Sequence, residues 1–418
     1  MQRHFTGFEK SEKTQAMKIL IVHNFYGSVA PSGENQVFEA ERDLLIRRGH
    51  EVKTYTRHSD EIRRWGALGT LQGALATPWN PFAAGKLRRL LELEQPDVMH
   101  VHNTFPLLSP AIFHAIESEV ALVLTLHNYR LFCPAAIPIR RSKACTECID
   151  IRSAWPSLRY GCYRVSRFAT LPLAVSVGLH RILGTWKNKI DAFITLSDFQ
   201  RKIMVAAGLP ENKVHVKPNF YPGLPVAPPW KEREDYAVFA GRISEEKGVE
   251  NLIRAWIKWG DCAPELRILG DGPLREKLAG LADAQLKVRI RFHGQIESDR
   301  AQNEIARARL LVLPSVCFEG FPMVVREAFA FGTPVAVSDI GPLPDIVKHG
   351  ESGVVFKPGN PESLKDEVRK AWETPGMLER LGEGARAAFL KEYTEDVNYK
   401  RLMEIYEAAI RTRRRKRA

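Results

Sequence analysis

Long apolar runs are missing from this 418-residue chain. A helix that spans a bilayer needs about 20 apolar residues, and the longest candidate, residues 168–179, is interrupted by Pro172. The first sixteen residues are polar and mixed in charge, whereas a secretion signal needs an apolar core. We therefore expect a cytoplasmic protein in which residues 1–16 form a disordered tail and a buried strand opens after Met17.

Cysteine is scarce, and its placement is uneven. Four of the six cysteines lie within thirty residues, at Cys133, Cys145, Cys148 and Cys162. A reducing compartment excludes structural disulfides, so two interpretations stay open. Four thiolates can close a tetrahedral zinc site that pins a poorly hydrophobic loop. The alternative is four reduced thiols, two of them simply buried.

The fingerprints of two other function classes are also absent. A dinucleotide-dependent oxidoreductase needs G-x-G-x-x-G after a strand, and the one candidate, Gly270-Asp271-Gly272, continues as Pro-Leu-Arg. The net charge of +12 favours anionic partners. Because the basic residues are spread and no nucleic-acid-binding module is recognisable, we expect no nucleic-acid partner.

What the chain does contain is a repeated alternation of short apolar strands and amphipathic helices, which is typical of parallel α/β sheets. The alternation is interrupted at residues 221–230, which hold four prolines, and it restarts at residue 236. The pattern predicts an α/β protein with two Rossmann-like domains facing each other across a cleft. Expected boundaries are an N-terminal domain at 17–220 with a cysteine-containing insertion at 128–165, a linker at 221–235, a C-terminal domain at 236–394, a helix at 395–411 packing back across the hinge, and a solvated basic tail at 412–418.

The C-terminal half opens with a strand followed by a basic loop, VFAGRISEEKG. Arg242 and Lys247 lie after the carboxyl end of that strand, where open α/β sheets bind their ligands. Arginine can hold two phosphate oxygens at once and lysine acts as a point charge. These two cations can therefore neutralise a diphosphate, although the loop alone is compatible with ordinary surface charges.

A second motif, EGFPMVVRE, places Glu319 before a helix and Glu327 inside it. Pro322 suits a first helical turn, and a helix N-terminus offers free amides and a positive dipole end to an anion. Each carboxylate can accept hydrogen bonds from two neighbouring sugar hydroxyls.

Together these motifs resemble the donor site of retaining GT-B glycosyltransferases of the family-4 type. Three more segments agree with the family, ILGDGPL at 268–274, FHGQI at 292–296 and the run from Asp339 to Leu364. The resemblance covers residues 17–399 and is nearest to a bacterial polysaccharide-type subgroup with a cysteine-containing insertion. It is specific for the superfamily and does not identify the substrate.

The resemblance implies a role for each matching residue. Arg242 and Lys247 would hold the donor diphosphate, Glu327 the ribose and Glu319 the sugar. His127, which ends a buried strand, would reach the donor sugar from the acceptor side, although a histidine there is often only structural. The remaining implied donor contacts are Gly33, in a loop without the usual double glycine, Ile296 at the base, and the backbone around Phe321, Met323 and Val324. His100 and His102 are as compatible with a structural role as with the acceptor site.

The implied reaction is that of a hexosyltransferase. A sugar passes from a UDP-, GDP- or ADP-linked donor to a saccharide or polyprenyl-linked acceptor with retention of configuration, in cell-surface polysaccharide biosynthesis. No metal is required for catalysis in this family. The alternative is a non-catalytic nucleotide-sugar-binding protein of the same fold.

Residues 155–189 mix arginine, tyrosine, phenylalanine and tryptophan with apolar residues. Such a segment can lie on an anionic membrane, which here would be the inner face of the plasma membrane. The alternative is a helix that packs on the sheet in the ordinary way. The sequence leaves peripheral membrane association open.

Overall fold

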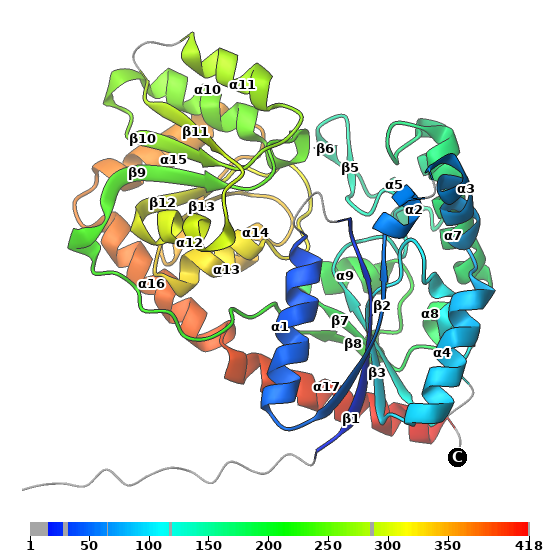
Figure 1. The fold of residues 1–418 in the computed structure, drawn as a ribbon. Coiled ribbons are helices and arrows are strands. Elements are labelled where there is room, and N and C mark those ends of the chain that lie inside the picture. The colour runs from blue at the N-terminus through cyan, green and yellow to red at the C-terminus, as the bar shows by residue number, and fades with distance from the viewer. Residues whose placement is uncertain (1–15, 28–31, 65, 117–118, 285–287, 417–418) are drawn as a thin grey trace, which may run out of the picture.

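The computed structural model describes residues 16–416 apart from 28–31, 65, 117–118 and 285–287. Within these residues the chain forms two six-stranded parallel sheets, one in each half (Figure 1). The first has the order β2 (Glu51–His58), β1 (Lys18–Phe25), β3 (Val98–Asn103), β4 (Ala121–Leu126), β7 (Ala192–Thr195) and β8 (Val214–Val216). The second has the order β11 (Ile290–Gly294), β10 (Glu265–Leu269), β9 (Glu234–Ala240), β12 (Ala308–Leu313), β13 (Val335–Ser338) and β14 (Gly353–Phe356).

The central strands are almost wholly buried because helices cover both faces of each sheet, as parallel sheets require. The helices of the N-terminal domain that pack around the sheet are α1 (Gly33–Arg47), α4 (Pro81–Glu94), α7 (Arg167–Ile182), α8 (Thr185–Asn188) and α9 (Asp198–Ala206), while α2 (Asp60–Arg64) packs on α3 (Gly66–Ala76), which packs on α7. In the C-terminal domain they are α10 (Val249–Trp259), α11 (Arg275–Asp283), α12 (Ser298–Arg307), α13 (Met323–Ala330), α14 (Leu343–Ile346), α15 (Pro361–Glu373) and α16 (Met377–Glu392). The predicted pair of Rossmann-like domains is confirmed.

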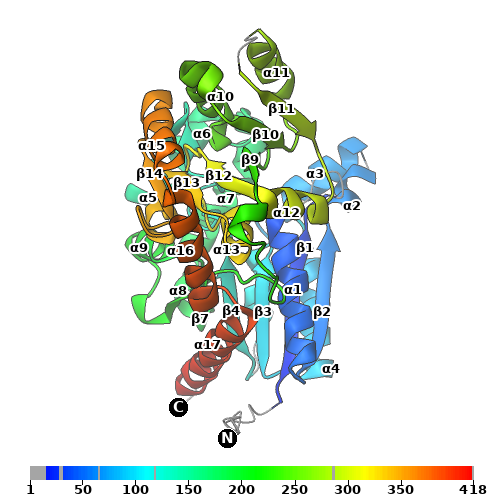
Figure 2. The same cartoon turned by 90° about the vertical axis from the view of Figure 1, so that its left-hand side faces the viewer.

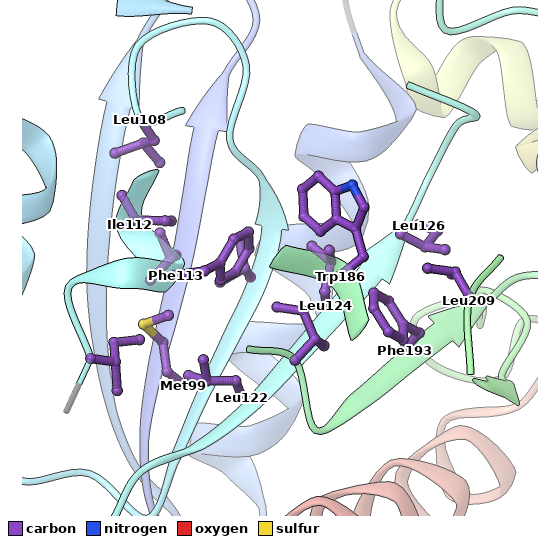
Figure 3. Close-up of a cluster of buried hydrophobic side chains, with 14 of the residues drawn as sticks. Met99, Leu108, Ile112, Phe113, Leu122, Leu124, Leu126, Trp186, Phe193 and Leu209 are labelled. Atoms are coloured by element: carbon purple, nitrogen blue, oxygen red, sulfur yellow. The ribbon is translucent and has the colours of Figure 1, made fainter. Parts of the chain in front are cut away.

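One hydrophobic core of the N-terminal domain lies between its sheet and the helices on one face (Figure 3). Met99 and Leu122 come from neighbouring strands, and Phe113 and Trp186 pack edge to face at 5.9 Å between ring centroids. The carboxyl ends of the strands are therefore held on a rigid support, and the site described below is built on them.

The last helix, α17 (Glu395–Arg415), belongs to neither sheet. It follows α16 down the molecule and lies under the N-terminal sheet (Figures 1 and 2). Its buried face, including Leu402 and Tyr406, joins the apolar cluster around Ile19 and Ile194. The helix thus returns from the C-terminal domain and fastens the two domains together.

Two expected boundaries are wrong. The helix does not end at residue 411 with a solvated tail after it, because Arg413 and Lys416 each lie 2.7 Å from a carboxylate oxygen of Asp191. Asp191 is buried, and a buried carboxylate needs such partners. Strand β9 begins at Glu234, inside the predicted linker. Residues 1–15, 417 and 418 lie outside the described residues.

The insertion predicted at residues 128–165 forms a short hairpin, β5 (Ile139–Arg140) and β6 (Lys143–Ala144), followed by α5 (Glu147–Asp150) and α6 (Trp155–Tyr160). Four of its side chains belong to the core beneath the sheet, those of Tyr129, Phe132, Cys133 and Ile149. At the hairpin tip, Ser142 hydrogen-bonds Glu245 of the C-terminal domain. The insertion therefore spans the space between the domains.

Along the described part of the chain, no helix combines the length and the apolar character that a membrane crossing requires.

Candidate active site

A cleft of about 830 Å³ lies between the two domains. It is lined by loops that follow the carboxyl ends of strands in both sheets, where open α/β sheets place their ligands. All ten residues predicted to act in catalysis or donor binding line it. They are Gly33, His127, Arg242, Lys247, Ile296, Glu319, Phe321, Met323, Val324 and Glu327.

The order of the second sheet explains why two distant motifs meet. The chain runs from β9 outward through β10 to β11 and then returns to place β12 on the other side of β9. The loops after β9 and β12 therefore flank the point where the strand order reverses. The first loop carries Arg242 and Lys247, and the second carries Glu319.

Lys247 and Glu319 form the charged centre of the cleft. Lys247 Nζ lies 2.7 Å from Glu319 Oε1, and Ser315 Oγ donates to the same oxygen over 2.6 Å. Burial alone would lower the pKa of Lys247, but the Glu319 carboxylate outweighs it and raises this pKa. The lysine is therefore a permanent cation that is already aimed into the cleft.

Arg242 is exposed on the cleft wall. Its guanidinium forms no ion pair or hydrogen bond with any of the described residues. Arg242 is therefore a cation on this wall that no carboxylate of the described residues neutralises. That charge suits a polyanionic ligand.

The turn that aims Lys247 depends on Gly248. Its φ is +66°, and a Cβ at this position would lie 2.0 Å from the carbonyl oxygen of Pro314. Only glycine accepts both constraints without strain. This contact presses the β9 loop against the β12 loop and sets the distance between lysine and glutamate.

Helix α13 begins at Met323 and directs its N-terminus into the cleft. The amides of Met323 and Val324 belong to its first turn, where no intrahelical acceptor exists. Glu327 lies one turn further along, and burial raises the pKa of its carboxyl although Arg326 opposes the shift. The helix thus presents free amides and a partly buried carboxyl group to one ligand.

The opposite wall comes from the N-terminal domain. His127 directly follows β4, and its carbonyl oxygen lies so near the other domain that a Cβ on Gly320 would come within 2.6 Å of it. Gly33 opens α1 and faces the side chain of Met323. The cleft is therefore narrow where the two predicted donor-binding walls meet.

Burial lowers the pKa of His127 well below its usual range, and the nearby rings of His102 and His23 add to the effect. His127 is consequently neutral near pH 7. A neutral imidazole has one donor and one acceptor nitrogen. Its role in the cleft depends on which nitrogen carries the proton.

The predicted zinc site is not supported. A tetrahedral zinc–thiolate site separates its sulfur atoms by about 3.8 Å, yet within the described residues no three cysteine sulfurs lie within 4.8 Å of one another. Burial raises the pKa of Cys133 to about 12 and that of Cys148 to about 11. As neutral thiols they pack as small apolar groups, and the insertion is held by its core contacts.

The motifs did not reveal several polar residues of the cleft. Asn128 donates to Glu34 Oε1 over 2.7 Å, and the other carboxylate oxygen of Glu34 is buried without a partner. Tyr129 donates to the carbonyl oxygen of Glu319 over 3.4 Å. Asn128 and Tyr129 directly follow His127, so their position after a buried strand was the one available signal. Glu34 gave none.

Comparisons with known proteins agree with this geometry. Residues 33–222 match the family model of Glycosyltransferase Family 4, and residues 224–388 match that of Glycosyl transferases group 1. The two matches follow one another along the chain and correspond to the two domains.

Individual relatives cover different shares of the chain. A glycosyltransferase of Methanocaldococcus jannaschii is 34% identical over 43% of this chain and 46% of its own length, so the match spans less than half of that relative. The Bacillus subtilis protein named “Putative teichuronic acid biosynthesis glycosyltransferase TuaC” is 24% identical over 89% of this chain and 95% of its own length.

Solved structures show the same fold. The Anabaena protein Alr3699/HepE, crystallised with UDP and glucose, superposes with a TM-score of 0.60 at 17% identity and covers 94% of this chain and all of its own. The two consecutive family matches cover most of the chain, and the two Rossmann-like domains agree with them. The chain belongs to the family-4 type of glycosyltransferases with the GT-B fold.

Proposed function

We propose that the protein transfers a hexose from a nucleotide-diphosphate sugar, with a UDP- or GDP-linked donor, and retains the anomeric configuration. The observation that carries the proposal is the meeting of Arg242, Lys247 and the N-terminus of α13 in one cleft with Glu319 and Glu327. Cations and free amides suit a diphosphate. The two carboxyl groups suit the hydroxyls of a sugar and a ribose.

In this proposal the diphosphate takes over Lys247 from Glu319. The lysine then faces the phosphates together with Arg242, and the released Glu319 carboxylate accepts hydrogen bonds from the donor sugar. Groups fixed in place before the reaction stabilise the negative charge that grows on the leaving phosphate. The cations and amides would do so without a metal ion.

Retention follows if the leaving diphosphate and the acceptor use the same face of the sugar. The glycosidic bond to the phosphate breaks as an oxocarbenium-like centre forms. The acceptor hydroxyl attacks that centre and passes its proton to the departing phosphate oxygen. No side chain becomes covalently linked to the sugar in this scheme.

We further propose a saccharide or polyprenyl-linked acceptor at the inner face of the plasma membrane, in cell-surface polysaccharide biosynthesis. A pocket of about 70 Å³ beside His127 extends to Leu173 and Val177 on the inner face of α7. The outer face of α7 is exposed and apolar, with Phe168 90% and Ile182 85% exposed. Helix α3 packs beside it (Figure 1) and exposes 74% of Leu68.

The two stretches of sequence that carry this apolar face are basic. Residues 62–91 hold five basic residues, residues 151–190 hold seven, and neither stretch contains an aspartate or glutamate. Exposed apolar side chains on basic segments are what an anionic bilayer surface attracts. A lipid-linked acceptor bound there would approach His127 along α7.

Calorimetric titration with UDP, GDP and ADP in the presence of a chelator tests the donor site. We expect micromolar binding of one nucleotide, at least tenfold weaker binding in Lys247→Ala, and no change in Lys258→Ala, an exposed lysine paired with Glu362. Binding without sugar transfer would favour the non-catalytic alternative. Failure of all three nucleotides to bind would overturn the donor site.

Sedimentation with vesicles tests the membrane face. We expect binding to phosphatidylglycerol vesicles but not to pure phosphatidylcholine, and loss of binding in a Phe168→Ser/Ile182→Ser double variant. Val226→Ser is the matched control, because Val226 is an equally exposed apolar residue in the linker. Equal binding by the double variant and the control would exclude this surface.

A further inference from the structure

A row of four polar side chains runs from the cleft to the hinge, and three of them, His102, Glu41 and Lys217, are buried. His127 Nε2 lies 3.1 Å from His102 Nδ1, His102 Nε2 lies 3.2 Å from Glu41 Oε1, and Glu41 Oε2 lies 2.7 Å from Lys217 Nζ. The four residues come from the end of β4, from β3, from α1 and from the segment after β8. The donor-site motifs include only the first of them.

The charges at the far end of the row are fixed. Glu41 and Lys217 are 1% and 2% exposed. Burial alone would raise the pKa of Glu41, but Lys217 and His100 outweigh it and hold this pKa well below its usual range. Lys217 also donates to Asn398 of α17 over 3.2 Å. Glu41 is therefore an anchored carboxylate, and its remaining oxygen, Oε1, lies 3.0 Å from His100 Nδ1 and 3.2 Å from His102 Nε2.

The proton on His102 can be placed from these contacts. Burial lowers the pKa of His102 to about 4, so the ring is neutral and carries one proton. A nitrogen lone pair 3.2 Å from a carboxylate oxygen would be repelled, whereas an N–H group is attracted. The proton therefore lies on Nε2, and Nδ1 is left as an acceptor facing His127.

The contact between His102 and His127 fixes the position of the proton on His127, at the edge of the cleft. Two ring nitrogens 3.1 Å apart share one proton, and since His102 Nδ1 has none, His127 Nε2 must supply it. We propose that Glu41 and His102 are positioning residues that fix His127 as its Nε2–H tautomer, so that Nδ1 accepts a hydrogen bond from a sugar hydroxyl in the cleft. The sugar part of this proposal rests on the proposed function, and the tautomer part does not.

Neighbouring groups are consistent with this assignment. His23, the third ring near His127, directs its Nε2 at Asn35 Oδ1 over 2.9 Å, and burial lowers its pKa to about 3. Among the described residues, Glu41, His100 and His102 are the one group of three with atoms close enough to share a metal ion. The Lys217 ammonium already occupies the cationic place beside Glu41, which favours a proton network over a metal.

Nitrogen NMR of the protein labelled with ¹⁵N-histidine tests the tautomer directly. The His127→Gln spectrum identifies the His127 signals by their loss. We expect wild-type His127 to carry its proton on Nε2 and to show a bare Nδ1. His102→Leu should release this preference, and His102→Asn should retain it because its Oδ1 can take the place of Nδ1.

The control is His50→Gln, since His50 is buried in the same domain and bonds Met17 and Tyr399 away from the cleft. It should leave the His127 signals unchanged. A wild-type His127 protonated on Nδ1 would overturn the proposal without any variant. An Nε2–H preference that survives in His102→Leu would overturn the positioning role.

Kinetics with the donor identified by calorimetry test the consequence. We expect His102→Leu to lower kcat at least tenfold with nucleotide affinity unchanged, and His102→Asn to restore most of the rate. An unchanged kcat in His102→Leu would overturn the positioning role. If no donor is transferred at all but the tautomer is as expected, the proposed function fails and the tautomer assignment stands.

Discussion

The two domains share one architecture but differ in how their interiors are made. Ten of the twelve histidines precede residue 220, and His23, His100, His102 and His180 are buried there. The C-terminal domain buries charge too, at Arg233 and Arg326, but the cluster in which Arg267 pairs with Glu234, Glu265 and Glu304 is partly exposed. Among the described residues, the buried histidines all lie in the N-terminal domain, which also buries the Glu41–Lys217 ion pair.

The difference shows where sequence motifs can be read. In the C-terminal domain the predicted site residues lie on loops at the ends of regular strands, so their spacing along the chain reports their position. In the N-terminal domain buried polar contacts join residues far apart in sequence, such as His100 and Tyr406. No local pattern records such a pair.

The largest effect should come from breaking the buried ion pair of the N-terminal domain. Lys217→Met leaves the Glu41 carboxylate buried without its lysine, which we expect to lower the free energy of unfolding by about 3–5 kcal/mol. Lys258→Met breaks the exposed pair with Glu362 in the C-terminal domain, and we expect it to change the free energy of unfolding far less, because solvent screens exposed ion pairs. Urea unfolding measures both, and equal costs would remove the contrast between the domains.

In the C-terminal domain the largest effect should be on catalytic activity. Glu319→Gln keeps the shape of the side chain but removes its charge, and we expect kcat/KM to fall about 100-fold, or about 2.7 kcal/mol. Glu362→Gln, an exposed acid of the same domain, should leave kcat/KM within twofold of the wild type. A similar loss in both variants would mean that Glu319 acts through general electrostatics.

Acid should destabilise the N-terminal domain first. Burial lowers the pKa of His23 to about 3 and those of His102 and His180 to about 4, whereas the unfolded chain protonates histidine near about 6.5. Between these values the unfolded state binds more protons, so stability falls as the pH falls. Each histidine should remove about 1.4 kcal/mol per pH unit below about 6.5.

Urea unfolding at pH 7.5, 6 and 5 measures this slope. His180→Phe should reduce it, since the variant removes one of the three groups. An unchanged slope in His180→Phe would contradict the assignment to buried histidines.

The smallest contrast is between two helix caps. Asn360 caps α15 on the exposed surface, and Asn360→Ala should cost about 1 kcal/mol. Asn80 caps α4 and also donates to the carbonyl oxygen of Leu107 over 2.6 Å inside the protein. Asn80→Ala should therefore cost about 2–3 kcal/mol. Equal costs in urea unfolding would mean that the buried hydrogen bond adds nothing.

The sequence predicted most of the fold because its signals are local. Apolar strands such as Lys18–Phe25 and helix stops such as Gly49 follow from periodicity and backbone preference. The predicted tail failed because the partner of Arg413 is Asp191, 222 residues away. The zinc prediction failed because spacing along the chain does not report the distances between sulfur atoms in space.

By itself, the sequence determined the two-domain α/β class, the loop carrying Arg242 and Lys247, and the helix between Glu319 and Glu327. Each of these features depends on residues that are close together in the sequence, within one or two helical turns or neighbouring strands. Only the tertiary structure decided that Lys247 pairs with Glu319, that α17 closes over the N-terminal sheet, and that Glu41 and His102 lie behind His127. These contacts depend on packing between distant segments, and burial then sets the charge and the protonation of each group.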